Sequence, residues 1–407
     1  MEGNDREQSC PTEIIRLRDF TPAFGIMPAR MGEVRRRFET LLAPSASSDA
    51  LSSEGNPVLS AQNTAGETFA LKLLKPPSRA HAPGDKTPDP ETLRMVMSSR
   101  ELAFAEEYRS MLAVSFLRGF PRVYGFGIAS GGRADSERSS SDGWERPAIV
   151  MEWIEGPTLR EALPHLPART YVDASGALRR SVLPEIAVSL GVAMLDILLG
   201  AGELDCTFLH RDLSPRNIIV RTSVTKLSEQ IASSTFDLRI VDLGSSSVLR
   251  TNERGITLTH DIWRFGTIEY AAPEMLTRDV PEVSRLRYSA TVDTYAICSM
   301  LYEMVCDRTP FELGRRPNSS PYLIKMREHP EVPIWLDGDA RALVRLLARG
   351  LSADQSMRYT PSELREALLS WPNEGKSPVG RARRGHRRSL LSALAGAARE
   401  WARERQG

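Results

Sequence analysis

His210-Arg-Asp-Leu-Ser-Pro-Arg-Asn217 follows an apolar helical pattern and precedes the strand-like run Ile218 to Val220. Asp212 in this stretch carries a carboxylate that can accept or orient the proton of a hydroxyl group. Asn217, five residues later, carries an amide oxygen of the kind that binds Mg2+. An isolated His-Arg-Asp can also be a helix cap with neighbouring charges, so the sequence on either side decides its interpretation.

A second carboxylate lies at the end of an apolar strand pattern, Leu238-Arg-Ile-Val-Asp-Leu-Gly244. Asp242 follows Asn217 by 25 residues. A carboxylate at a strand end can bridge a metal ion to phosphate groups, and Gly244 allows the chain to turn away sharply. Because Asp-x-Gly at a strand end is also a common turn, its distance from Asn217 is what gives it functional weight.

An apolar strand with one cation is predicted upstream, at Thr68-Phe-Ala-Leu-Lys-Leu-Leu74. A lone lysine in such a strand often extends its side chain from the sheet edge to solvent. Here the strand is followed by a Glu-rich helical pattern at residues 90–117 and then by a second strand pattern at Val123 to Gly127. This order, rather than the strand alone, decides how Lys72 is interpreted.

Along the chain, the strand with Lys72 comes first, the stretch 210–217 second and the strand end with Asp242 third. In that order they resemble the strand V-A-I-K, the catalytic loop H-R-D-L-x-x-x-N and the metal-binding D-F-G of eukaryotic-like protein kinases, in particular the bacterial Ser/Thr kinases. The resemblance implies that the chain moves the γ-phosphoryl group of ATP to Ser or Thr hydroxyls of proteins. It implies catalytic roles for Asp212, Arg211 and Lys72, with Lys72 at the α and β phosphates. Asn217 and Asp242 would bind Mg2+.

The same resemblance implies that a glutamate on the helix after Lys72 forms an ion pair with it. Glu101, in Ser99-Arg-Glu-Leu-Ala-Phe104, best matches the family pattern of a glutamate followed by apolar residues. Glu106 and Glu107 lie on the same helical pattern and remain alternatives. We therefore expect Glu101 to contribute to nucleotide binding.

The glycine-rich loop that covers the phosphates in this family matches poorly. Of the pattern G-x-G-x-x-G-x-V, the sequence keeps Gly32 and Val34, but Met27 and Ala29 stand where the first two glycines are expected. The loss of these glycines hinders a close approach of the backbone to phosphate, so we expect modest nucleotide affinity. Residues 32–38 are predicted to form a strand.

The adenine site is predicted at Ile149-Val-Met-Glu-Trp-Ile-Glu-Gly156, which resembles the hinge between the two lobes of the family. Met151 would lie behind the adenine ring, and backbone groups of Glu152 and Ile154 would bind its edge. Ala70, on the upstream strand, would line the same site. A core strand followed by a turn predicts the same letters almost as well, because backbone binding needs no particular side chain.

Further matches lie in segments that do no chemistry. Gly266-Thr-Ile-Glu-Tyr-Ala-Ala-Pro-Glu274 resembles the family's G-T-x-x-Y-x-A-P-E, in which Thr267 is typical of Ser/Thr specificity. Asp293, on an apolar helical pattern, would brace the catalytic loop, and Arg358 would pair with Glu274. A buried ion pair persists only with both partners present, because either charge alone is costly. Together, these motifs in family order form a specific signal.

Two features leave other functions open. Ser214 replaces the lysine expected two residues after the catalytic aspartate, and Arg216 is the cation that could partly replace it. With the poor glycine loop, this keeps an inactive or weakly active pseudokinase scaffold as an alternative. A small-molecule alcohol kinase is a second alternative, although such enzymes lack the A-P-E segment. Thr257 and Thr259, shortly before Thr267, are predicted autophosphorylation sites.

The pattern of strands followed by long amphipathic helices predicts an α+β fold of two lobes, a small mainly β N-lobe with one key helix and a larger mainly α C-lobe. Loops rich in Ser, Gly and Pro are predicted at residues 44–67, 76–90 and 129–147. The predicted parts are an N-terminal extension (1–19), the N-lobe (20–154), the C-lobe (155–372) and a basic C-terminal tail (373–407).

Composition limits the expected partners and location. The 53 Lys and Arg residues nearly cancel the 52 Asp and Glu residues, so nucleic acid is not an expected partner. Four cysteines without C-x-x-C spacing favour a reducing compartment. We recognise neither a secretory signal nor an apolar stretch of the roughly 18 to 20 residues that a bilayer requires. We expect a cytoplasmic protein that phosphorylates proteins, including itself, and whose arginine-rich tail could contact an anionic surface.

Overall fold

The computed structural model describes most of the chain outside its termini and several connections. The described residues are 12–24, 28–44, 56–75, 90–132, 144–203, 207–245, 247–249, 268–277 and 281–371. The chain divides into two units, residues 1–368 and 369–407, and the second lies almost entirely outside the described residues. The fold and the site therefore belong to the first unit.

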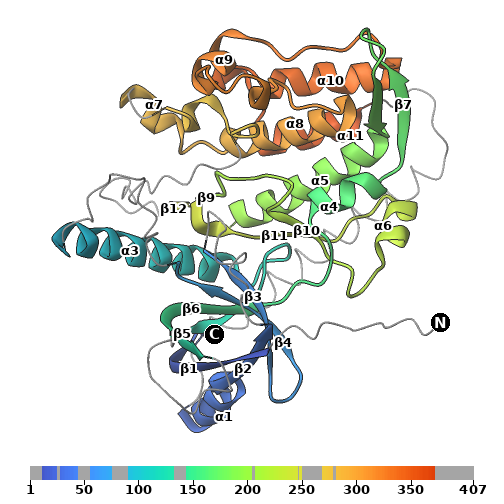
Figure 1. The fold of residues 1–407 in the computed structure, drawn as a ribbon. Coiled ribbons are helices and arrows are strands. Elements are labelled where there is room, and N and C mark those ends of the chain that lie inside the picture. The colour runs from blue at the N-terminus through green and yellow to red at the C-terminus, as the bar shows by residue number, and fades with distance from the viewer. Residues whose placement is uncertain are drawn as a thin grey trace, which may run out of the picture. The chain divides into compact units, whose positions relative to one another are not determined.

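Six strands close into a barrel in the first part of the chain (Figure 1). Their order around the barrel is β1-β2-β3-β4-β6-β5, and neighbouring strands pair antiparallel. Helix α1 connects β1 to β2, and α3 follows β4. The elements are β1 (Thr12–Pro22), α1 (Pro28–Glu39), β2 (Thr40–Pro44), β3 (Val58–Asn63), β4 (Thr68–Leu73), α3 (Pro90–Val114), β5 (Val123–Gly132) and β6 (Trp144–Glu152).

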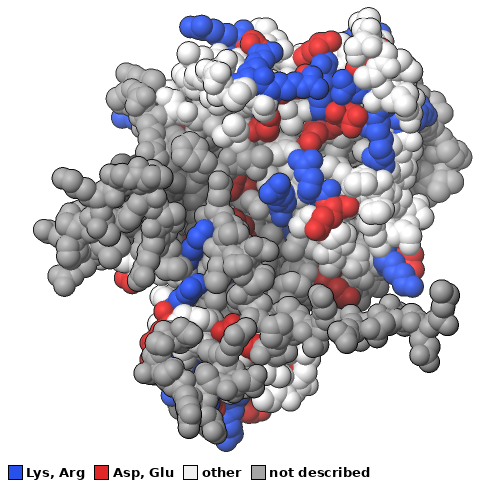
Figure 2. All heavy atoms as spheres, in the orientation of Figure 1, with Lys and Arg blue, Asp and Glu red and all other residues white. Residues whose placement is uncertain are grey.

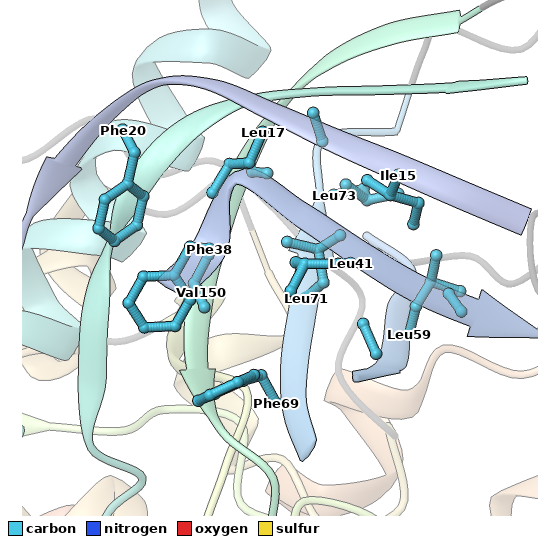
Figure 3. Close-up of a cluster of buried hydrophobic side chains, with 14 residues drawn as sticks. Ile15, Leu17, Phe20, Phe38, Leu41, Leu59, Phe69, Leu71, Leu73 and Val150 are labelled. Atoms are coloured by element: carbon cyan, nitrogen blue, oxygen red, sulfur yellow. The ribbon is translucent and has the colours of Figure 1, made fainter. Parts of the chain in front are cut away.

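The barrel encloses a core of aliphatic and aromatic side chains (Figure 3). The ring of Phe38, at the end of α1, lies 4.8 Å from the ring of Phe20 on β1 and 5.0 Å from that of Phe69 on β4. Tilted and edge-on pairs of this kind add to the energy of apolar burial. The aromatic core therefore joins α1 to the strand that carries Lys72.

The prediction of a strand at residues 32–38 is wrong, because these residues form part of the helix α1. Val34 and Phe38 are four residues apart, and both pack against the barrel core. Gly32, on the same helix, is exposed. Apolar contacts at this spacing are those of a helix with one face on a core. The prediction of a strand came from the alignment with the glycine-loop pattern. The spacing of the apolar residues is that of a helix, and the structure agrees with this spacing.

Two predicted boundaries in the barrel are also wrong. β1 begins at Thr12 and pairs with both β2 and β5, so residues 12–19 of the extension expected at residues 1–19 belong to the barrel. β3 lies inside the loop predicted at residues 44–67. Its side chains alternate between solvent and core, with Leu59 and Ala61 buried. This alternation is expected of a strand with one face on the core, because successive side chains point to opposite faces. The surrounding serines and polar residues concealed this short alternation.

The second part of the chain is built mainly of helices, as predicted (Figure 1). α8 is buried over nearly its whole length and packs against α5 and α10. The helices are α4 (Leu159–Ala162), α5 (Pro184–Gly202), α6 (Leu227–Ser233), α7 (Pro281–Leu286), α8 (Thr291–Cys306), α9 (Pro321–Arg327), α10 (Gly338–Gly350) and α11 (Pro361–Ser370). Short 3-10 turns are η1 (Leu163–His165), η2 (Leu243–Ser245), η3 (Pro273–Met275), η4 (Leu313–Arg315) and η5 (Gln355–Met357).

Two-stranded sheets between these helices hold the predicted catalytic motifs. β9 pairs with β12, and β10 pairs with β11. β9 and β10 flank the stretch 210–217, and β11 ends two residues before Asp242. A further hairpin of β7 and β8 was not predicted from the sequence. The strands are β7 (Ala168–Val172), β8 (Leu178–Val182), β9 (Thr207–Leu209), β10 (Ile218–Val220), β11 (Leu238–Ile240) and β12 (Ser247–Leu249).

Helix α5 is the one described helix that is long and apolar enough to cross a bilayer. However, 56% of its most apolar window is buried inside the protein, where residues such as Leu190 and Leu195 are fully covered. Burial of this extent is what a core helix shows, since its apolar side chains already have protein partners.

Candidate active site

The catalytic loop, residues 210–217, is closed by hydrogen bonds between its own ends. Asn217 Nδ2 donates to the backbone oxygen of Asp212 at 2.8 Å, and Asn217 N donates to Ser214 O at 3.0 Å. The backbone oxygen of Asn217 accepts from Val241 N at 2.9 Å. The loop therefore places Asp212 and Asn217 together and ties both to the chain just before Asp242.

Asp293, near the start of α8, holds this loop in shape. Its two carboxylate oxygens accept hydrogen bonds from the backbone N–H groups of His210 and Arg211, both at 2.8 Å. Arg211 has a φ of 64°, an unfavourable conformation for a residue with a side chain, and the bond to Asp293 stabilises it. Asp293 is almost fully buried. The bracing role predicted for it is confirmed.

The His210 ring links the catalytic loop to the strand end before Asp242. Its Nε2 lies 3.1 Å from Val241 O, and its Nδ1 accepts from Asp212 N at 3.3 Å. Burial lowers the pKa of His210, although the neighbouring Asp293 carboxylate acts in the opposite direction. The neutral ring with its proton on Nε2 satisfies both contacts. His210 thus orients the backbone at Asp212 without carrying a charge.

Lys72 on β4 forms ion pairs with carboxylates from two other elements. Its Nζ donates to Glu107 Oε1 on α3, and it lies 2.6 Å from Asp242 Oδ1. The side chains of Lys72 and Glu107 are 3% and 1% exposed, so this pair is nearly closed to water. Lys72 therefore joins the barrel, α3 and the segment after β11 at a single point.

Glu107, and not Glu101, is the partner of Lys72, and the expectation for Glu101 is wrong. Six positions along a helix rotate a side chain by roughly 240°, which puts the two glutamates on different faces. Glu101 is exposed, whereas Glu107 is buried together with Phe104 and Met111. These last three residues are spaced by three and four positions, and that spacing was the signal in the sequence that favours Glu107.

Asp242 and Asn217 form a donor set that fits a divalent cation. The amide nitrogen of Asn217 is bound to Asp212 O, so its amide oxygen is the atom suited to a metal. Asp242 has a φ of 60°, and its side chain is 38% exposed beside the Lys72 ammonium. Carboxylate and amide oxygens are ligands that Mg2+ prefers. Among the described residues, no group of three or more His, Cys, Asp or Glu side chains is placed for a metal ion.

The residues predicted around the adenine ring meet where β4 pairs with β6. Ala70 lies opposite Met151 in the register of these strands, and both side chains are buried. Glu152 ends β6, and its backbone N–H donates to Arg122 O at 2.8 Å. Ile154 lies two residues beyond the strand and is buried. The structure thus brings these predicted residues together at one end of the barrel.

Gly32 and Val34 lie elsewhere, and their expected role in covering the phosphates is wrong. Both belong to α1, where Val34 packs against the barrel core. The register places Val58 of β3 opposite Lys72. Residues 45–57 connect β2 to β3, and they therefore lead into the strand that pairs with β4 at Lys72. The structure describes the last two of these residues.

Asn56, one of these two residues, is a site residue that the sequence did not reveal. Its Nδ2 lies 3.5 Å from Glu107 Oε2, and its Oδ1 accepts from Lys75 N at 3.1 Å. Asn56 therefore links the start of β3 to the end of β4 and to the partner of Lys72. Nothing in the polar stretch around it distinguishes it in the sequence.

Arg358 and Glu274 form the second buried ion pair that the sequence predicts. The guanidinium donates to both carboxylate oxygens, at 2.6 and 2.9 Å, and the side chains are 0% and 4% exposed. Such a bidentate pair is strong and specific in geometry. Gln355 donates to the same carboxylate at 2.8 Å. The predicted pairing is confirmed, and it fastens η3 to η5.

The contacts described above do not test the roles predicted for several other residues. Ser214 is buried, and Arg216, which could replace the missing lysine, is exposed. The role of Arg216 stays a prediction. Thr257, Thr259 and Thr267 lie outside the described residues, as does the whole of the basic tail.

Comparisons with known proteins agree on one family. The sequence model of the protein kinase domain matches residues 149–369. The chain is 28% identical over 190 residues to a putative serine/threonine-protein kinase of Mycoplasma pneumoniae, covering 46% of this chain and 43% of that protein. It is 26% identical over 290 residues to the probable serine/threonine-protein kinase PknB of Lactococcus lactis, covering 69% and 36%.

A similar match links the chain to the serine/threonine-protein kinase PrkC of Bacillus subtilis. The identity is 23% over 219 residues, which are 54% of this chain and 28% of PrkC. In each of these comparisons, the chain spans less than half the length of the curated relative. The match to the family model begins in β6, so the rest of the barrel lies outside it.

Proposed function

This chain belongs to the protein kinase family, and from that premise we propose that it transfers the γ-phosphoryl group of ATP to Ser or Thr hydroxyls of proteins. One observation carries the proposal: Lys72 Nζ contacts Glu107 and Asp242 together. Three distant parts of the chain thereby place a cation for phosphates beside a carboxylate for a metal. The similarity to bacterial serine/threonine-protein kinases supports the choice of acceptor.

Asp212 is the residue that would act on the acceptor hydroxyl. Asn217 binds its backbone oxygen, and His210 accepts from its backbone N–H, so its position in the loop is fixed on both sides. A carboxylate held in this way can orient the hydroxyl and accept its proton during transfer. Asp293 supports this arrangement through the two preceding residues of the loop.

Lys72, Asp242 and Asn217 would act on the nucleotide side. Lys72 would bind the α and β phosphates, and Glu107 would keep its ammonium in place. Asp242 and Asn217 would hold Mg2+, which when bound neutralises negative charge on the phosphates. The contact of 2.6 Å between Lys72 and Asp242 keeps the phosphate-binding and metal-binding groups within reach of one another.

We assign the barrel and α3 to an N-lobe and the helix-rich part to a C-lobe. The predicted limits at residues 154 and 372 remain our proposal, whereas the N-lobe is taken to begin with β1 at Thr12. Ala70, Met151 and Ile154 would then bind adenine at the junction. Their meeting at the end of β6 supports this assignment.

The acceptors are proposed to include the chain itself, through Thr257 and Thr259. We also propose that the protein works in the cytoplasm. The described cysteines, Cys298 and Cys306, are free and buried thiols, which suits a reducing compartment. Contact of the basic tail with an anionic surface is a further part of this proposal.

The test is transfer of labelled phosphate from ATP to protein acceptors in the presence of Mg2+, with the modified residues mapped by mass spectrometry. We expect label on Ser and Thr, and its loss in Lys72→Met and in Asp212→Asn, the latter with nearly unchanged ATP affinity. Lys226→Met removes an exposed lysine and should behave as the wild type. Wild-type turnover in either site variant would remove the site assignment, and label on small alcohols alone would remove the function.

A further inference from the structure

Lys325 on α9 is a buried cation that the site described above does not use. Its side chain is 0% exposed. Its Nζ donates to the backbone oxygens of Ile268, Glu269 and Ala271, at 2.8, 2.9 and 2.6 Å. An ammonium group has three N–H donors, and each has an acceptor here. Lys325 thus binds the main chain of one short segment.

The surroundings of Lys325 disfavour a charge. Burial lowers its pKa to about 7; Glu269 and Glu274 raise it, and Arg358 lowers it further. The ring of Tyr295, 5.3 Å from Nζ, offers a face that attracts cations but replaces only part of the lost hydration. An apolar side chain could fill this space without that cost. A lysine at this position is therefore best explained by the carbonyls that it binds.

The segment that Lys325 holds, residues 268–271, joins two parts of the proposed enzyme. In the sequence it follows Thr267 and precedes Pro273 and Glu274, and the latter is fastened by the buried ion pair with Arg358. Lys325 fastens the opposite end of the same stretch. The chain next to Thr267 is therefore held from α9.

The same segment is also linked to the catalytic loop. The hydroxyl of Tyr270 contacts Glu303 of α8 and the guanidinium of Arg160. The backbone N–H of Arg160 donates to Pro215 O, within the catalytic loop, at 2.9 Å. A continuous series of hydrogen bonds and covalent bonds therefore links α9, through residues 268–271 and Arg160, to the catalytic loop.

We propose that Lys325 is a positioning residue for the protein acceptor, which fixes the backbone of residues 268–271 beside the catalytic loop. The proposal rests on the proposed kinase function. The segment that Lys325 binds is linked to the catalytic loop, whose Asp212 is proposed to act on the acceptor, whereas Lys72 and Asp242 are proposed to act on the nucleotide. Loss of Lys325 should therefore affect the acceptor and leave ATP binding unchanged.

Steady-state kinetics with an acceptor peptide and with ATP separate the two sides. Lys325→Met removes the three donors but keeps an apolar stem, and we expect it to raise KM for the acceptor about tenfold, with KM for ATP unchanged. Lys325→Arg keeps a charged donor and should recover part of the loss. Arg327→Met, which removes an exposed cation from the same helix, is the matched control and should behave as the wild type.

Hydrogen exchange tests the anchoring independently of catalysis. In Lys325→Met, the amides of residues 268–275 should exchange faster, while those of β4 and α3 exchange as in the wild type. Wild-type acceptor KM and wild-type exchange in this variant would overturn the proposal. So would equal changes in both KM values with faster exchange throughout the chain, because the role would then be general stability.

The two proposals fail in different ways. A wild-type protein that phosphorylates no protein would overturn the proposed function, and with it the acceptor role of Lys325. In that case, local exchange still decides whether Lys325 anchors residues 268–271: faster exchange in Lys325→Met upholds the anchor, and unchanged exchange overturns it.

Discussion

Replacing Glu107 with glutamine would isolate the ion pair that aligns Lys72. The substitution keeps the shape of the side chain and removes its charge, so the ammonium loses its buried carboxylate and keeps the contact with Asp242, whose side chain is 38% exposed. The Lys72 and Glu107 side chains are 3% and 1% exposed, and breaking such a buried pair costs about 3 to 5 kcal/mol. If the transition state bears this whole cost, kcat/KM falls roughly 100- to 5,000-fold.

The matched control for this prediction is Glu101→Gln, which changes the same residue type on the same helix at an exposed position. Initial rates of phosphate transfer over a series of ATP concentrations give kcat/KM for both variants and the wild type. Thermal unfolding of each protein shows whether the fold is retained. Equal losses in the two variants, or a fully active Glu107→Gln that remains folded, would refute the argument that Glu107 holds Lys72.

Three further predictions concern stability, switching and surface binding. Arg358→Ala leaves the Glu274 carboxylate buried without its cation, so the free energy of unfolding measured in urea should fall by about 3 to 5 kcal/mol; a change within error contradicts this. Combined Thr257→Ala and Thr259→Ala should remove most activity, and mass spectrometry of a fully active wild type with both threonines unmodified would exclude the switch. Deleting residues 376–407 should weaken binding to anionic vesicles at low salt, and equal binding would dispose of a membrane role for the tail.

The catalytic motifs could be predicted from the sequence because their chemistry fixes both the residue types and their spacing. The loop of residues 210–217 and its brace Asp293 are examples, since a hydrogen-bonded loop tolerates few other letters. The pair of Glu274 and Arg358 was predictable for a similar reason, because each charge needs the other in a buried place.

Residues defined by packing alone were beyond the reach of these motifs. The choice between Glu101 and Glu107 depends on which face of α3 is buried, and the local letters favoured the wrong one. Asn56 and Lys325 carry no pattern in the sequence, because only their tertiary contacts distinguish them from ordinary polar residues.

Strands with non-local partners were the weakest part of the fold prediction. β3 and the hairpin of β7 and β8 contain polar and charged residues, and their pairing rather than their composition makes them strands. For α1, the helical spacing of Val34 and Phe38 was present in the sequence, but the glycine-loop alignment concealed it. Long helices such as α5 and α8 were predictable from the sequence, because their apolar content is local information.

The closure of the barrel by β1 has a consequence for self-association. A sheet edge presents unpaired N–H and C=O groups to any strand that approaches, and a closed barrel presents none. A chain begun at residue 20 would keep the whole catalytic loop but lose most of β1, so β2 and β5 would become the edges of an open five-stranded sheet. Such edges are templates for pairing with another chain. The strand that starts at Thr12 thus removes two edges at which another chain could pair.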